Sequence, residues 1–167
     1  MTMNVIWGGI RPGRSAVVAL GAFLLMLLQV TAAHAAGPVQ FRFTEPISMT
    51  DTTTCGFPIA LNFQVDVVGQ AFYDAQGNFQ SAIIHQNGVG TDSANGITLR
   101  ESDHFTDFVN ADGSTKEVGL PIHIQGGGVV IRDAGYILFN PDGSVAFTHG
   151  PHPFLEGDTA AYCAALS

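Results

Sequence analysis

The sequence predicts an all-β fold, a single antiparallel up-and-down β-barrel of about eight strands with one short C-terminal helix. Apolar and polar residues alternate from residue 59 to residue 72, which is the periodicity of a half-buried strand. Three similar turn segments, each with Asp or Asn first and Gly fourth, separate runs of strand-forming residues. Together these patterns indicate an antiparallel meander, and closure into a barrel would remove exposed sheet edges. A β-sandwich is the alternative.

The turn segments predict hairpins because Asp or Asn can cap a tight turn and Gly adopts the left-handed conformation that closes it. Further strands are expected around them, with Pro46 ending the first strand and Gly69 marking a bulge or bend. The glycine run 126–128 predicts a flexible turn or sharp bend, and the Ala-rich stretch 158–166 predicts the helix. The turns occupy residues 74–78, 110–114 and 140–144, and the further strands residues 39–44, 97–100 and 128–132.

The N-terminal 35 residues have the three parts of a secretory signal peptide. Arg11 and Arg14 lie in a start that contains no acid, and residues 16–30 are almost wholly apolar. Small residues follow, with an Ala-x-Ala site that predicts cleavage between Ala35 and Ala36. A retained membrane anchor is the alternative interpretation. The apolar run argues against it, because it is shorter than the roughly 20 residues that a spanning helix needs.

Removal of this segment leaves one secreted domain, residues 36–167, with no stable membrane insertion expected after cleavage. All 14 acidic residues of the chain belong to this domain. Its strong bases are Arg42, Arg100, Lys116 and Arg132. An acidic surface of this kind repels phosphate backbones, so nucleic acid is excluded as an expected partner. The sequence makes no prediction of oligomeric state.

Cys55 and Cys163 are the two cysteines of the chain, and they lie near opposite ends of the predicted domain. Thiols outside the cell tend to oxidise, and an even count without another partner indicates a pair. A disulfide between them is therefore expected.

The chain resembles a group of functionally uncharacterised secreted proteins typical of actinobacteria. The resemblance rests on Cys-Gly-Phe-Pro at residues 55–58, on Gly-Gly-Gly-Val-Val and Asp-Ala-Gly within residues 126–135, and on Cys-Ala-Ala-Leu at residues 163–166. It implies a compact antiparallel barrel with the cysteines bridged, and it carries no activity. In outline such a barrel is similar to allene-oxide-cyclase-like and dirigent-like barrels, a likeness of fold that does not fix function.

Two polar groupings contain residue types found in chemical sites. His149 and His152 could chelate a metal with Asp103 or His104, but the Gly-Pro between the two histidines prevents helical spacing and a polar loop accounts for both. The sequence also has no dinucleotide-binding or phosphate-binding glycine motif. No metal and no cofactor are therefore expected.

The second grouping consists of Glu101, Asp103 and Asp107 around His104. A His–Asp pair can act as a base and its orienting group. Neighbouring residues of a strand point to opposite sides, however, so a solvated turn between two strands is the preferred interpretation. No catalytic residue is assigned.

Aromatic residues suggest a ligand pocket, because a barrel of about eight strands can be filled by side chains or can hold one small molecule. The candidate lining residues are Phe63, Phe72, Phe79, Phe105, Phe139 and Phe147. We expect a secreted, non-catalytic binding or structural module, with a small apolar molecule as the partner to test. The alternative is a cofactor-free cyclase or isomerase that uses His123 or Asp66 inside the barrel.

Overall fold

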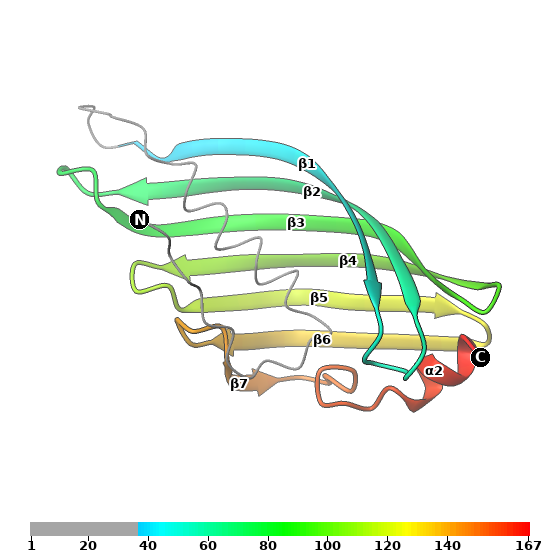
Figure 1. Ribbon diagram of the computed structural model, residues 1–167. Coiled ribbons are helices and arrows are strands. Elements are labelled where there is room, and N and C mark those ends of the chain that lie inside the picture. Colours follow the sequence, from blue (N-terminus) through cyan, green and yellow to red (C-terminus); the bar gives the residue numbers. More distant parts are fainter. Residues whose placement is uncertain (1–36) are drawn as a thin grey trace, which may run out of the picture.

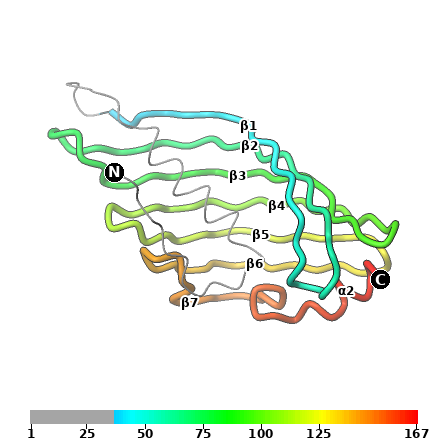
Figure 2. The backbone as a smooth tube through the Cα atoms, viewed as in Figure 1, coloured from blue at the N-terminus to red at the C-terminus, as the bar shows by residue number. Residues whose placement is uncertain are grey.

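The computed structural model describes residues 37–167 and shows one antiparallel sheet whose seven strands follow one another in chain order (Figure 1). The hairpin ends of the first two strands bend across one face of the sheet and approach the C-terminal helix (Figures 1 and 2). The predicted signal peptide and its cleavage site lie outside the described residues. The elements are β1 (Val39–Asp51), β2 (Ile59–Tyr73), β3 (Phe79–Ala94), β4 (Ile97–Asn110), β5 (Thr115–Gly126), β6 (Val129–Phe139), β7 (Val145–His149) and α2 (Ala160–Ala165).

The antiparallel meander is confirmed, whereas the closed barrel is wrong, and a single sheet also excludes the β-sandwich. Closure would require β1 to pair with β7, but β7 has 5 residues against 13 in β1. After His149 the chain runs on along β6 and then forms α2, so it supplies no long final strand. The result is a curved trough with two sheet edges.

Strand β1 is longer than the sequence predicts. Pro46 does not end it, and pairing with β2 continues to Asp51. Proline has no N–H to donate, but an edge strand needs hydrogen bonds on one side alone, so proline is tolerated there. The strand expected at residues 97–100 likewise continues without a break to Asn110 as the single strand β4.

The three predicted hairpin turns are confirmed. In the first, the Asp74 carboxylate accepts hydrogen bonds from the backbone N–H of Gln76 at 2.9 Å and of Asn78 at 2.8 Å. Gly77 there has a φ of 83°, in the left-handed region that glycine adopts without strain. In the other two turns the third residue accepts in place of the predicted first one: the Asp112 and Asp142 carboxylates accept the backbone N–H of Ser114 and Ser144, each at 2.9 Å.

Glycines on the concave face let the sheet curve. Phe41 lies opposite Gly69 across β1 and β2, and Phe63 lies opposite Gly90 across β2 and β3. A side chain at either glycine would collide with the ring of the facing phenylalanine. Of the bulge or bend predicted at Gly69, the bulge is absent because the pairing keeps its register there, and the glycine makes room for an aromatic ring.

The C-terminal segment closes the curled end of the trough. The Cys55–Cys163 disulfide is confirmed and joins the β1–β2 hairpin to α2, with the two Cα atoms 5.3 Å apart. A core cluster at this end is built around the buried Ile59, Leu99 and Tyr162 and includes residues of α2. The helix covers a shorter range than the predicted residues 158–166.

We predict that replacing both cysteines by serine lowers the free energy of unfolding by about 4–5 kcal/mol, because the bridge closes a long loop in the unfolded chain. The loop spans a sequence separation of 108 residues. Urea denaturation of the double variant measures the loss. Ala161→Ser, an exposed change on the same helix, is the matched control and should leave the midpoint in place. A loss below about 1 kcal/mol would contradict the closing role of the bridge.

Candidate functional site

A cavity of about 210 Å³ lies on the concave side of the sheet, at the curled end. Its walls come from β1 to β6, from the β1–β2 hairpin, from residues 154–155 and from Tyr162 of α2. The same elements that close this end of the trough therefore shape the cavity.

Most of the cavity wall is apolar, as the alternation along each strand requires. Every second residue of β2 faces inward, and the inward series continues on β5 and β6. The apolar lining residues are Ile47, Met49, Leu61, Phe63, Val65, Phe105, Pro121, Ile122, Ile124, Ile137, Phe139, Phe154 and Leu155.

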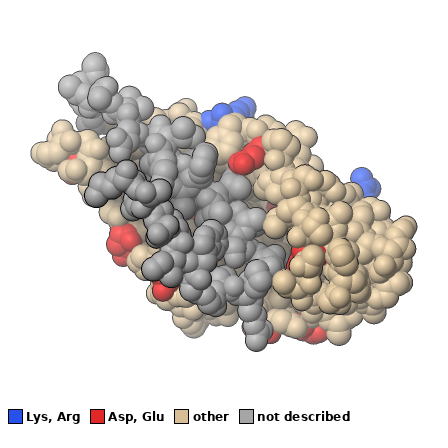
Figure 3. Space-filling view, in the orientation of Figure 1, with Lys and Arg blue, Asp and Glu red and all other residues tan. Residues whose placement is uncertain are grey.

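Six carboxylates also line the cavity, and no base is among its lining residues. These are Asp51, Asp92, Glu101, Asp103, Glu117 and Asp133. The bases of the described chain, Arg42, Arg100, Lys116 and Arg132, are all exposed and alternate with inward residues, so they point to the convex side. In Figure 3 the basic side chains in sight lie along the upper rim of the molecule. The described bases thus all lie on the side of the sheet away from the cavity.

Several of these carboxylates hold the cavity wall together. Asp133 is 1% exposed and accepts the backbone N–H groups of Phe154 and Leu155, each at 2.9 Å. Asp103 accepts the backbone N–H of His123 at 3.1 Å. These bonds fix the C-terminal segment on β6 and tie β4 to β5.

Tyr162 donates its hydroxyl to Asp92 at 2.8 Å, in the buried wall formed by α2 and β3. Burial, followed by the negative charges of Asp92, Glu101 and Asp51, raises the pKa of Tyr162. The phenol therefore keeps its proton at neutral pH and donates it in the hydrogen bond to Asp92.

Asp51 ends β1 at the rim of the cavity. Partial burial alone would raise the pKa of its carboxyl group, but hydrogen bonds from Thr54 and Thr53 outweigh burial and lower it. The Thr53 backbone N–H donates at 2.7 Å. Asp51 therefore carries a negative charge at neutral pH.

Further along the trough, Asp107 on β4 lies directly opposite Glu117 on β5 and Ile84 on β3. Gln86 donates its amide to the Asp107 carboxylate at 2.6 Å. Burial raises the pKa of Asp107 to about 6, although the Gln86 hydrogen bond acts in the opposite direction. The trough thus contains an acid that titrates near neutral pH.

The interpretation of residues 101–107 as a solvated turn is wrong. They lie inside β4, which continues from Ile97 to Asn110, so Glu101, Asp103 and Asp107 all face the concave side. A register shift between Glu101 and His104 accommodates the pairing with β5 without ending the strand. His104 points to the opposite side, where it contacts Asn87 at 2.8 Å.

The structure places half of the candidate phenylalanines in the cavity. Phe63, Phe105 and Phe139 line it. Phe79 packs edge-on against Tyr73, with ring centroids 5.9 Å apart, in a separate cluster towards the other end of the trough. Phe72 alternates with inward residues and points outward. Phe147 lies on β7 and is 51% exposed.

The two histidines weighed as metal ligands form no such site. His152 is buried, and its Nε2 lies 3.3 Å from the His149 carbonyl oxygen, a contact within the chain turn after β7. Among residues 37–167, no group of three or more His, Cys, Asp or Glu side chains is placed to hold a metal ion.

Asp66 and His123, on which the cyclase alternative depends, do not face the cavity. Asp66 is exposed and bonded to Thr44 of β1. His123 lies between the inward Ile122 and Ile124, and its Nδ1 is 3.2 Å from the Ser102 hydroxyl. That form of the enzyme hypothesis therefore loses both of its proposed residues.

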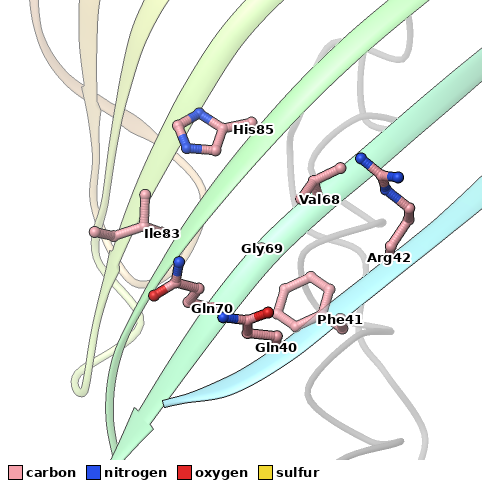
Figure 4. A pocket seen from close by; sticks show the side chains of 8 residues that line it. All are labelled: Gln40, Phe41, Arg42, Val68, Gly69, Gln70, Ile83 and His85. Atoms are coloured by element: carbon pink, nitrogen blue, oxygen red, sulfur yellow. The ribbon is translucent and has the colours of Figure 1, made fainter.

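A second depression, of about 470 Å³, lies across β1, β2 and β3 at the other end of the trough. Figure 4 shows its lining, which mixes the amides of Gln40 and Gln70 with Arg42, Ile83 and His85. Its polar side chains alternate with the inward residues of their strands and therefore lie on the convex face. The depression is thus not continuous with the acidic cavity.

Comparisons of the chain with protein-family models, with curated proteins and with solved structures found no match. In the described part of the chain, no helix combines the length and apolar character needed to cross a membrane. The site is therefore interpreted from its own geometry.

We predict that Asp107→Asn raises stability at about pH 7.5 by on the order of 2 kcal/mol and has no effect near pH 4. The folded pKa of about 6 lies above the ordinary 3.8, so the native state binds this proton more tightly than the unfolded state. Stability from this group is present below about pH 4 and is lost as pH rises through about 6.

Urea denaturation at both pH values tests this prediction. Glu156→Gln, a change of an exposed acid in the loop before α2, is the control and should have no pH-dependent effect. A variant that is less stable than the parent protein at neutral pH would contradict the cost assigned to the ionised Asp107.

Proposed function

We propose that this domain is a non-catalytic binding module, acting outside the cell, for a small apolar molecule that carries a positive charge. The observation that carries the proposal is the cavity wall, which combines apolar side chains with six carboxylates and includes no base.

The apolar surface sets the size and the driving force of binding. A cavity of about 150 Å³ lined by apolar side chains takes up benzene, and drug-sized pockets begin near about 300 Å³. The cavity here, at about 210 Å³, fits a ligand between these limits, such as one fused aromatic ring system. Removing that ring system from water would supply most of the affinity.

The carboxylates favour a cationic ligand. Charges of one sign inside a low-dielectric cleft focus the electrostatic potential, which attracts the opposite charge and repels the same charge. Asp51 contributes a charge whose lowered pKa keeps it ionised. A neutral ligand would gain no attraction from these charges, and an anionic ligand would be repelled by them.

Binding without chemistry agrees best with the roles of the acids. Asp51, Asp92, Asp103 and Asp133 all accept hydrogen bonds from neighbouring parts of the chain that form the cavity wall. Groups engaged in this way hold the site open in one shape, which suits recognition and not proton transfer to a substrate.

Secretion is supported by two observations. The N-terminal segment has the pattern of a signal peptide, and the Cys55–Cys163 disulfide is consistent with an oxidising compartment. The resemblance to secreted actinobacterial proteins agrees with the same location.

We predict that the purified protein binds naphthylmethylamine at least about tenfold more tightly than naphthylmethanol, and naphthoate most weakly. The three probes share one ring system and differ in charge. Titration calorimetry measures the affinities, and added salt should weaken the binding of the amine alone.

Glu101→Gln should reduce the affinity for the amine and leave the affinity for the alcohol unchanged, because it removes one charge from the cavity wall. Asp158→Asn, an exposed acid outside the cavity, is the matched control. Equal binding of amine and alcohol would refute the charge preference, and no saturable site for any probe would refute the binding function.

Export has its own test. We expect the protein recovered from the culture medium to begin at Ala36, as read by N-terminal sequencing or intact mass. A chain that remains in the membrane fraction with its N-terminus intact would contradict cleavage.

A further inference from the structure

Strands β2 and β3 contain three glycines, Gly69, Gly88 and Gly90, which belong to the inward series of their strands. The missing side chain of each leaves a space on the concave face. A β-carbon added at Gly69 would collide with the ring of Phe41, and one added at Gly90 would collide with the ring of Phe63. Aromatic rings of the protein therefore fill two of the three spaces.

The space at Gly88 is not filled in this way. A β-carbon added there would lie 3.5 Å from the Oδ2 atom of Asp103 and 3.9 Å from the Cγ2 atom of Val65, which are ordinary contact distances. Strand β3 lies between β2 and β4 (Figure 1), and Gly88 pairs with Val65 on one side and with Asp103 on the other. All three residues line the cavity of about 210 Å³, so the space opens into it.

The packing of the chain does not explain why this residue is a glycine. Glycine in the interior of a strand weakens it, because it loses more conformational freedom on folding and packs no side chain. At Gly69 and Gly90 an aromatic ring requires the space, whereas alanine would fit at Gly88. The φ angle of Gly88 also lies outside the left-handed region that favours glycine. A ligand that enters the space would supply the missing reason.

The walls of this space indicate the chemistry of the group that enters. Asp103 accepts the backbone N–H of His123 at its Oδ1 atom, which fixes the orientation of the carboxylate, and its Oδ2 atom borders the space. Glu101 lies two residues away on the same face of β4 and also lines the cavity. A small cationic group that donates hydrogen bonds would gain most here, because charge-assisted hydrogen bonds to carboxylates are the stronger kind.

We propose that Gly88 determines which ligands the cavity accepts: the space beside it receives the primary ammonium group of the ligand, against the Asp103 carboxylate. The inference rests on the proposed binding function and names the ligand class as primary amines attached to an apolar ring system.

Size and hydrogen bonding both favour a primary over a quaternary ammonium group. A primary ammonium group is close to a methyl group in size, and the contact distances at Gly88 accommodate a methyl group. It also brings N–H donors to the carboxylate. A trimethylammonium group is larger, has no N–H to donate, and is recognised in proteins by the faces of aromatic rings. The atoms nearest to this space belong to Asp103 and Val65.

Titration calorimetry on the disulfide-bonded protein tests the proposal with naphthylmethylamine, its N,N,N-trimethyl derivative and naphthylmethanol. We expect the primary amine to bind at least about tenfold more tightly than the trimethyl derivative. Gly88→Ala should abolish the preference for the amine over the alcohol, because its methyl group takes the place of the ammonium group. Val89→Ile is the matched control and should keep the preference, because Val89 is the next residue of β3 and is 57% exposed on the convex face.

Asp103→Asn separates the charge from the space. The asparagine keeps an acceptor for the His123 N–H, so the wall can retain its shape while the charge is removed. We expect this variant to reduce the preference for the amine more than Glu101→Gln does. An effect of Glu101→Gln that is as large or larger would place the ammonium group elsewhere and overturn the proposal.

Urea denaturation tests the space itself without a ligand. Gly88→Ala should keep or raise the midpoint of the parent protein, whereas Gly90→Ala should lower it, because its methyl group collides with the Phe63 ring and the Asn62 carbonyl oxygen. Equal destabilisation by the two substitutions would refute an open space at Gly88.

The binding results distinguish this inference from the function on which it rests. A parent protein that shows no preference for the amine over the alcohol would refute the proposed function and the role of Gly88 together. A preference that is present in the parent protein and survives in Gly88→Ala would refute the role of Gly88 alone, as would equal binding of the primary and trimethyl amines.

Discussion

The attachment of the C-terminal segment to the β1–β2 hairpin is the constraint on which the rest of the structure depends. A curved sheet of seven strands whose edges do not meet must cover its concave apolar face by other means. Here the disulfide holds the hairpin against α2, and Tyr162 packs into the core cluster at that end. Without this attachment the inward residues of β1 and β2 would lose the opposing wall, and the cavity would become an open groove.

The acids on the concave face carry a cost that the fold offsets locally. Burying a carboxylate is unfavourable unless it accepts hydrogen bonds. Asp133 accepts two backbone N–H groups of the C-terminal segment, and Asp92 accepts the Tyr162 hydroxyl at its Oδ2. At Asp107 the Gln86 hydrogen bond does not offset burial, which raises the pKa of the carboxyl group to about 6. Apolar side chains of the same volume would fill these positions without the cost of burying a charge. Such departures from the stable choice are expected at binding sites.

Sequence reasoning succeeds here where the signal is local. The Asp and Asn turns act within five residues, and Asn95–Gly96, with φ values of 51° and 80°, is an equally clear hairpin signal that the turn pattern did not include. Closure of the sheet was not predictable, because it depends on the length of β7 and on the path of the chain beyond it. The inward acids were missed because the polar residues from Glu101 to Asp107 resemble a turn that separates two strands. In the structure β4 continues through them, and the alternation of a strand places Glu101 and Asp107 on the concave face.

The central claim is that the curled end of one unclosed sheet forms an acidic, apolar cavity for a cationic ligand. An experimental structure of the exported protein crystallised with naphthylmethylamine tests it most directly. We expect the ring to lie among the lining phenylalanines and the ammonium group to face the carboxylates. We also expect β1 and β7 of one chain to form no hydrogen bonds with each other. Hydrogen bonding between β1 and β7 in a closed barrel, or a ring bound elsewhere with the cavity filled by side chains, would contradict it.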